Sequence, residues 1–182
     1  DVRRAALCWD NTTVHVFEIE SGKELLTLPG SLGSVGWLRF SPDGRWLVAR
    51  HHATTTNGIL WNLETRTVAR RFRAAQGIFT DGAYDFSPDS RWLASADQSA
   101  GVHVYELTDE KSTVTLGVGL AARTLRFSPD GGRLALGAGG IVEIWDVTAR
   151  QPLGRFEPGF HVEWISWHPG GEWVCVNGYS GD

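Results

Sequence analysis

Histidine is the side chain best suited to acid–base catalysis and metal binding near neutral pH, and the chain contains six of them. His51 and His52 are adjacent, but neighbouring side chains in an extended segment point to opposite sides, so the pair chelates one metal ion badly. His15 and His103 share one repeated position beside apolar residues, which favours a structural role. No histidine forms a recognisable catalytic arrangement with a serine, a cysteine or a carboxylate pair. The sequence therefore predicts no catalytic residue, no metal site and no cofactor.

Two further patterns resemble chemical sites but fit turns better. The glycine-rich segment 137–140 resembles a phosphate loop, yet it precedes a predicted strand. Without a helix N-terminus it lacks the converging N–H groups that hold a phosphate. The carboxylates of Asp43, Asp89 and Asp130 each follow a Ser-Pro pair, where turn chemistry explains them. We interpret both patterns as turns.

Two short patterns recur along the chain with one period. The first is Phe-Ser-Pro-Asp-Gly or a variant of it, found at 40–44, 86–90, 127–131 and 167–171. The second is an apolar run around an aromatic residue, such as Val-Glu-Ile-Trp-Asp-Val, found at 14–19, 58–63, 102–107 and 142–147. Two independent patterns that keep a period of roughly forty residues indicate a repeated supersecondary unit.

Each unit has room for four short strands. Proline fixes φ at the first central position of a turn, and Asp and Gly suit the bend after it, so the first pattern joins two antiparallel strands. The second pattern is a third strand, apolar on both faces, and a more polar fourth strand follows it each time. With no helical periodicity, the sequence predicts an all-β fold: a β-propeller of four-stranded antiparallel blades.

The order of a Phe-Ser-Pro-Asp-Gly turn and a Val-x-Ile-Trp-Asp strand resembles the WD40 repeat family. The resemblance covers essentially the whole chain and is strongest in 31–73 and 118–156. The family's Gly-His pair is missing from all four units, and Thr55, Ser99 and Gly139 replace the Asp that usually precedes the third strand. A TolB-like propeller shares the Ser-Pro-Asp-Gly turn, but the Ile-Trp-Asp strand favours the WD40 assignment.

The repeat divides the chain into three whole blades and two partial ones. The whole blades are expected at 31–73, 74–117 and 118–156, and the partial blades at 1–30 and 157–182. In one arrangement, residues 161–177 pair with 14–28 and close a four-bladed ring. In the other, the chain is a slice of a larger propeller, continued by further blades of the same full-length chain. Residues 5–9 already resemble a second strand and would duplicate 173–176, so we favour an incomplete ring with about four blades present.

Composition and charge argue against several classes of partner. Hydrophobic residues make up 42% and charged residues 21%, as in ordinary globular proteins. The net charge of −4 and the absence of a basic stripe argue against nucleic-acid binding; the arginines at 66, 70, 71 and 73 are interpreted as a solvated strand edge. No apolar run reaches the roughly 18 residues of a membrane span. Cys8 and Cys175 fall in predicted strands, which favours free buried thiols.

The candidate contact residues lie in loops and near strand entrances. His51 and His52 are expected in a loop inserted between two strands, where a specific contact can be added, although an idle polar loop is the alternative. In the WD40 family this face is a frequent docking surface, and matching positions include the segment 76–80. The resemblance thus implies protein-binding candidates at His51, His52, Phe79, Arg123, Phe160, His161 and Glu163. Burial between blades is the alternative for Phe79 and Phe160.

The resemblance implies a non-catalytic protein-interaction scaffold that presents loops on a rigid propeller and binds a protein or peptide. The alternative is a regulatory or substrate-recruiting propeller attached to a catalytic domain, a serine/threonine kinase or a signalling ATPase, outside this segment. A Gly-rich loop and a His-Arg-Asp loop upstream would support the kinase version. More blades and nothing else would favour the plain scaffold.

Overall fold

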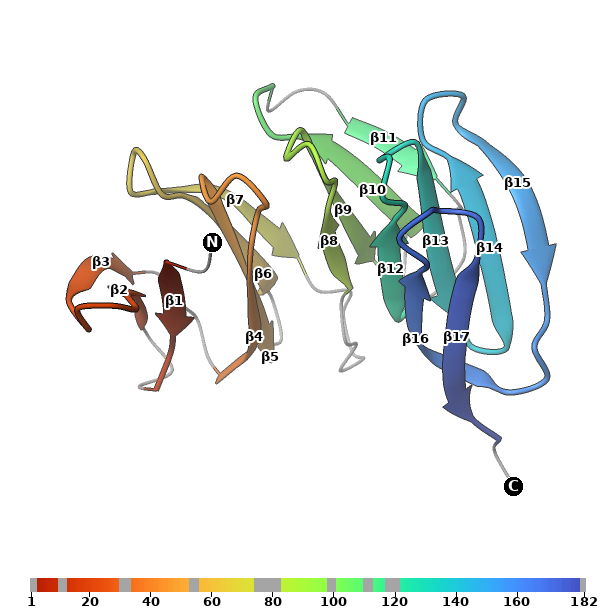
Figure 1. The fold of residues 1–182 in the computed structure, drawn as a ribbon, viewed down its shortest axis with the longest axis horizontal. Helices are drawn as coiled ribbons and strands as arrows, with labels where there is room; N and C mark the ends of the chain where they lie inside the picture. Colours follow the sequence, from red (N-terminus) through yellow and green to blue (C-terminus); the bar gives the residue numbers. More distant parts are fainter. Residues whose placement is uncertain are drawn as a thin grey trace. The chain divides into compact units, whose positions relative to one another are not determined.

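The computed structural model describes residues 3–9, 13–29, 34–52, 56–73, 83–97, 101–109, 113–116 and 122–180. Within these ranges there are 17 strands and no helix, and all strand pairs are antiparallel (Figure 1). The prediction of an all-β fold built from four-stranded antiparallel sheets is confirmed. The chain divides into two compact units, unit 1 at Asp1–Phe79 and unit 2 at Thr80–Asp182.

Unit 1 contains two sheets. The first is three-stranded, in the order β1 (Arg4–Leu7), β2 (Thr13–Glu18) and β3 (Glu24–Pro29). The second is four-stranded, in the order β4 (Ser34–Phe40), β5 (Trp46–His52), β6 (Thr56–Asn62) and β7 (Thr67–Arg73). β1 pairs with β2 and β3 pairs with its other edge, so both edges of β2 are occupied. The place beside β2 that a four-bladed closure would give to residues 161–177 is therefore taken.

One apolar cluster joins the two sheets of unit 1. It combines Val14 and Leu28 of the first sheet with Leu47 and Ile59 of the second, all with no exposed surface. Trp61 is 1% exposed, and its indole N–H donates to the carbonyl oxygen of Pro29 at 3.3 Å. The aromatic residue of the repeated third strand thus packs on the neighbouring sheet and also bonds to its backbone.

Unit 2 contains three sheets. The first has the order β11 (Thr113–Leu116), β10 (Gly101–Glu106), β9 (Trp92–Asp97) and β8 (Tyr84–Phe86). The second has the order β12 (Thr124–Phe127), β13 (Arg133–Ala138), β14 (Ile141–Asp146) and β15 (Gln151–Phe156). The third consists of β16 (His161–Trp167) and β17 (Val174–Tyr179).

Hydrogen bonds between side chains and backbone connect the edge strands of unit 2. The buried carboxylate of Asp85 in β8 accepts the Phe127 N–H of β12 at 2.8 Å. The Trp167 indole of β16 donates to the carbonyl oxygen of Arg126 at 2.9 Å. Because a buried backbone group without a partner is costly, these bonds stabilise the stacking of one sheet on the next.

The repeated turns have the predicted chemistry. In the first, the Ser41 hydroxyl donates to Asp43 at 2.6 Å and accepts the Trp46 N–H at 3.0 Å, and Asp43 accepts the Arg45 N–H at 3.0 Å. The turns that begin at 87 and 128 repeat these bonds. Gly44 ends the turn with a φ of 71°, which glycine adopts without steric cost.

One prediction about the cysteines is wrong. Both thiols are free, but Cys175 is exposed and Cys8 is half-buried. The neighbours of Cys175 in β17, Val174 and Val176, pack against the β12–β15 sheet. Because successive side chains alternate between faces, Cys175 points to the opposite face, where it is exposed.

Candidate interaction surface

Four of the predicted contact residues come together at one end of unit 2. This strand-entry end is where β12 and β16 begin and where β13 turns into β14. The Arg123 N–H, just before β12, donates to the carbonyl oxygen of Gly137 at 2.8 Å, and the Val162 N–H donates to Gly139 at 2.6 Å. These bonds hold the start of β12 to the end of β13 and the start of β16 to the β13–β14 turn, so the predicted residues Arg123, Phe160, His161 and Glu163 lie at one end of the unit.

Gly137 makes this close approach possible. A Cβ atom at this position would lie 2.5 Å from Val162 Cγ1 and 2.8 Å from Thr124 Cγ2, much closer than carbon atoms pack. Gly139 and Gly140 form the turn that was expected of the segment 137–140. Gly137 itself lies in β13, where its missing side chain lets β16 pack onto the sheet.

The four predicted residues differ in how much of each side chain is exposed. Phe160 is half-buried, whereas Arg123, His161 and Glu163 are exposed. The His161 ring stacks on Tyr179 of β17 with centroids 5.4 Å apart. The pairing of β16 with β17 shifts between Val162 and Trp164, so Glu163 is the extra residue of a β-bulge. A bulge re-aims the side chains beside it, which explains why Glu163 and Trp164 are both exposed.

An arginine–tryptophan pair beside them was not predicted. The guanidinium carbon of Arg126 lies 4.2 Å from the ring centroid of Trp164, within cation–π range, and Trp164 is 51% exposed. Arg126 also donates from Nη1 to the carbonyl oxygen of Leu125 at 2.6 Å. We call Arg123, Arg126, His161, Glu163 and Trp164 the β16 surface.

The candidates in unit 1 are placed differently. The predicted loop position of His51 and His52 is wrong, because β4 extends to Ser34 and both histidines continue β5, paired with Val35 and Ser34. His51 is 3% exposed and so offers little surface for contact in this structure. Phe79 and the segment 76–80 lie outside the described residues.

The titratable groups mostly serve local structure. The Ser128 hydroxyl and the Gly132 N–H lower the pKa of Asp130. Burial raises the pKa of Asp89, but hydrogen bonds from Ser87 and Arg91 outweigh it, so the net shift is downward. His15 contacts Glu24 at 2.9 Å and His103 contacts Thr115 at 3.1 Å. Among the described residues, no three His, Cys, Asp or Glu side chains form a group that could hold a metal ion.

Comparison with known families gives one match. Residues 22–54 match the family model described as WD domain, G-beta repeat, which confirms the predicted resemblance to the WD40 repeat family. The matched segment contains β3 of the first sheet together with β4 and β5 of the second. No curated protein matches the chain. No helix in the part of the chain that the structure describes has the length and apolarity to cross a membrane.

Proposed function

We propose that this chain, a WD40 repeat protein, is a non-catalytic scaffold that binds a protein or peptide partner. WD40 domains generally serve as scaffolds without catalytic activity. Residues on strands of packed sheets are held more precisely than residues on loops, which suits a preformed binding surface. This favours contact through strand residues at the strand-entry end of unit 2 as much as through loops.

The observation that carries the proposal is the exposed Trp164 beneath the Arg126 guanidinium. Tryptophan and arginine are the side chains most enriched among the residues that dominate binding energy. Here they come from two different sheets and are stacked before any partner arrives, so little rotamer freedom remains to be lost on binding. His161 and Glu163 extend the same surface with polar groups.

The β16 surface carries both positive and negative charge, which limits the chemistry of the partners that could bind it. Arg123 and Arg126 contribute two guanidinium groups and Glu163 one carboxylate. A partner that complements it carries an apolar side chain for Trp164 with an acidic group beside it. Complementary charge of this kind sets orientation and association rate more than affinity.

Affinity enrichment with three forms of the protein tests the proposal. One variant combines R123A, H161A and E163A, and the second is Trp164→Ala. The control combines T148A, Q151A and E172A, three exposed positions at the opposite strand ends of unit 2. We expect the same partner to be captured by the wild type and the control and to be lost from both β16-surface variants.

Circular dichroism and thermal melting show whether each variant is folded. If the wild type, the control and the β16-surface variants are all folded and capture the same proteins in equal amounts, the β16 surface is not the binding site. The alternative, a propeller attached to a kinase or ATPase domain, is tested separately by reading the upstream gene for the two kinase loops.

A further inference from the structure

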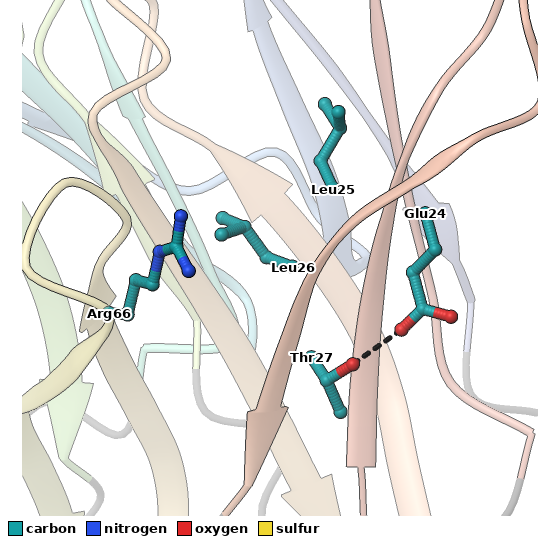
Figure 2. A pocket seen from close by; sticks show the side chains of 5 residues that line it. All are labelled: Glu24, Leu25, Leu26, Thr27 and Arg66. Carbon is teal, nitrogen blue, oxygen red and sulfur yellow. Dashed lines mark hydrogen bonds between the residues drawn. The ribbon is translucent and has the colours of Figure 1, made fainter.

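A second candidate site lies in unit 1, at the outer edge of β3. A pocket of about 550 Å³ is lined by Glu24, Leu25, Leu26 and Thr27 of β3 and by Arg66 (Figure 2). Four consecutive residues include side chains from both faces of a strand, so the pocket follows the strand's edge. β3 is the last strand of its sheet, and no described strand pairs with its outer edge. Its outward N–H and C=O groups are therefore open to an added strand.

Arg66 supplies a positive charge to this pocket. It ends the turn between β6 and β7, in which Asn62 Oδ1 accepts the N–H groups of Glu64 and Thr65 at 2.9 and 3.1 Å. Its guanidinium extends toward Leu26, as Figure 2 shows. No described residue forms an ion pair with Arg66, whereas Arg45 pairs with Glu64 at 3.1 Å.

Unit 2 contains a similar turn that ends at Arg150, which does not line the β3 pocket. Arg150 has a φ of 57° and Arg66 one of 61°, both in the left-handed region. In both turns the side-chain oxygen four residues before the arginine accepts a backbone N–H: Asn62 Oδ1 in the first, and Asp146 Oδ1, which accepts the Ala149 N–H at 2.7 Å, in the second. The unusual φ thus belongs to the turn, and what distinguishes Arg66 is its place in the lining of the β3 pocket.

Glu24 is already engaged by its own sheet. Its carboxylate accepts hydrogen bonds from the Thr27 hydroxyl at 2.5 Å and from His15 at 2.9 Å, and these two contacts lower its pKa. Figure 2 shows Glu24 and Thr27 bonded together on the side of the pocket away from Arg66. The charge that remains available to a ligand is the Arg66 guanidinium, and Leu25, 36% exposed, adds an apolar contact.

We propose that the outer edge of β3 binds an extended peptide segment of a partner protein, which adds a strand to the first sheet and places an acidic side chain against Arg66. Strand addition satisfies the open backbone groups of β3 and supplies affinity. The guanidinium–carboxylate contact, which can be bidentate, selects an acidic residue at one position. This site uses none of the residues of the β16 surface, so it extends the proposed function with an independent contact.

A titration of isotope-labelled protein followed by NMR tests this site. The probe is a capped peptide of about seven residues, the length of a strand, which alternates Thr and Val around one central Glu. A peptide with Gln in place of that Glu is its control. We expect backbone shifts to change along Glu24–Pro29 and the Gln peptide to bind about fivefold more weakly, roughly the 1 kcal/mol of an exposed ion pair.

Arg66→Ala and Arg150→Ala form the matched pair of variants. Both remove an exposed arginine at the same turn position, so they affect folding similarly. We expect R66A to weaken binding of the Glu peptide about fivefold, R66K to restore most of it, and R150A to bind as the wild type does. The proposal would be overturned if the wild type did not bind the Glu peptide, or if R66A and R150A bound it equally well. Equal affinities for the two peptides, or shifts confined to residues away from β3, would overturn it as well.

The two binding proposals fail separately. If the β3 site is wrong but the scaffold proposal is right, the β16-surface variants lose the captured partner while the Glu peptide does not distinguish R66A from R150A. If the β16 surface does not bind a partner and the β3 site exists, the peptide titration gives the expected pattern and the captured proteins are the same for every β16-surface variant.

Discussion

Gly137→Ala is the substitution that tests the packing of unit 2 most directly. The added Cβ would lie 2.5 Å from Val162 Cγ1, 2.8 Å from Thr124 Cγ2 and 3.2 Å from Ile165 Cδ1. Apolar carbons prefer separations of roughly 3.5–4 Å, so β16 and β13 must separate by about 1 Å or the side chains must leave their rotamers. Val162 and Thr124 are β-branched and stiff at χ1, which makes the second route costly.

The expected loss of stability follows from this geometry. Inserting one carbon into a well-packed core typically costs about 1–3 kcal/mol, and two contacts below 3 Å with stiff side chains place G137A in the upper half of that range, at about 2–3 kcal/mol. Gly154→Ala is the control, because a Cβ there has nothing within 4 Å. Since alanine in a strand is favoured over glycine by roughly 0.5–1 kcal/mol, G154A should be neutral or stabilising.

Urea denaturation measured by tryptophan fluorescence gives both free energies. A double substitution identifies the cause: Val162→Ala removes the methyl group that the new Cβ meets first, so G137A/V162A should lose at least about 1 kcal/mol less than the sum of the single losses. A loss below about 0.5 kcal/mol for G137A, or strict additivity in the double variant, would show that β16 does not pack on β13 as described.

Three further outcomes are expected. Arg150→Gly should raise the unfolding free energy by roughly 0.5–1 kcal/mol, because glycine adopts the left-handed φ of this position without strain. Gly22→Ala should lower it by a similar amount, because the φ there is 66° and a Cβ meets nothing within 4 Å that could compensate. The urea midpoint should therefore shift upward for the first variant and downward for the second. The Ser128 hydroxyl and Gly132 N–H lower the pKa of Asp130 in the folded state. The ionised Asp130 therefore stabilises the fold above its ordinary pKa of 3.8, and this contribution is lost as the pH falls through the lower folded pKa. In Asp130→Asn the urea midpoint should fall less steeply between about pH 5 and pH 3. The exposed Cys175 should react with a thiol reagent faster than the half-buried Cys8, and a Cys175→Ser variant that keeps the fast phase would contradict the exposure of β17.

The turns and the strand plan could be predicted because their causes are local. The bonds around Ser41, for example, involve only residues within five positions of it. The end of β5 could not be predicted from its own residues, because His51 and His52 are polar and become strand only through pairing with β4. The role of Gly137 was equally hidden, since it depends on Val162, which belongs to another sheet.

The Arg126–Trp164 pair of the β16 surface was missed for a related reason. Strict alternation along β16 puts Val162 and Trp164 on one face and predicts that both are buried. The bulge at Glu163 breaks the alternation, so Val162 packs inward while Trp164 is exposed beneath Arg126. A single inserted residue reverses the face of every side chain after it, and nothing in the local sequence marks this position as a bulge.

The match at residues 22–54 explains why the binding candidates lie where two sheets meet. The matched segment includes the outer strand of one sheet and the first two strands of the next, so one sequence repeat contributes to two sheets. The β3 pocket combines such a strand with Arg66 of the next sheet, and the β16 surface combines Arg126 with Trp164 across a similar junction. Each surface exists only while its two sheets are stacked. Trp167, whose indole N–H donates to the Arg126 carbonyl oxygen, joins the two sheets of the β16 surface, so we expect it to support that proposed contact without touching a partner itself.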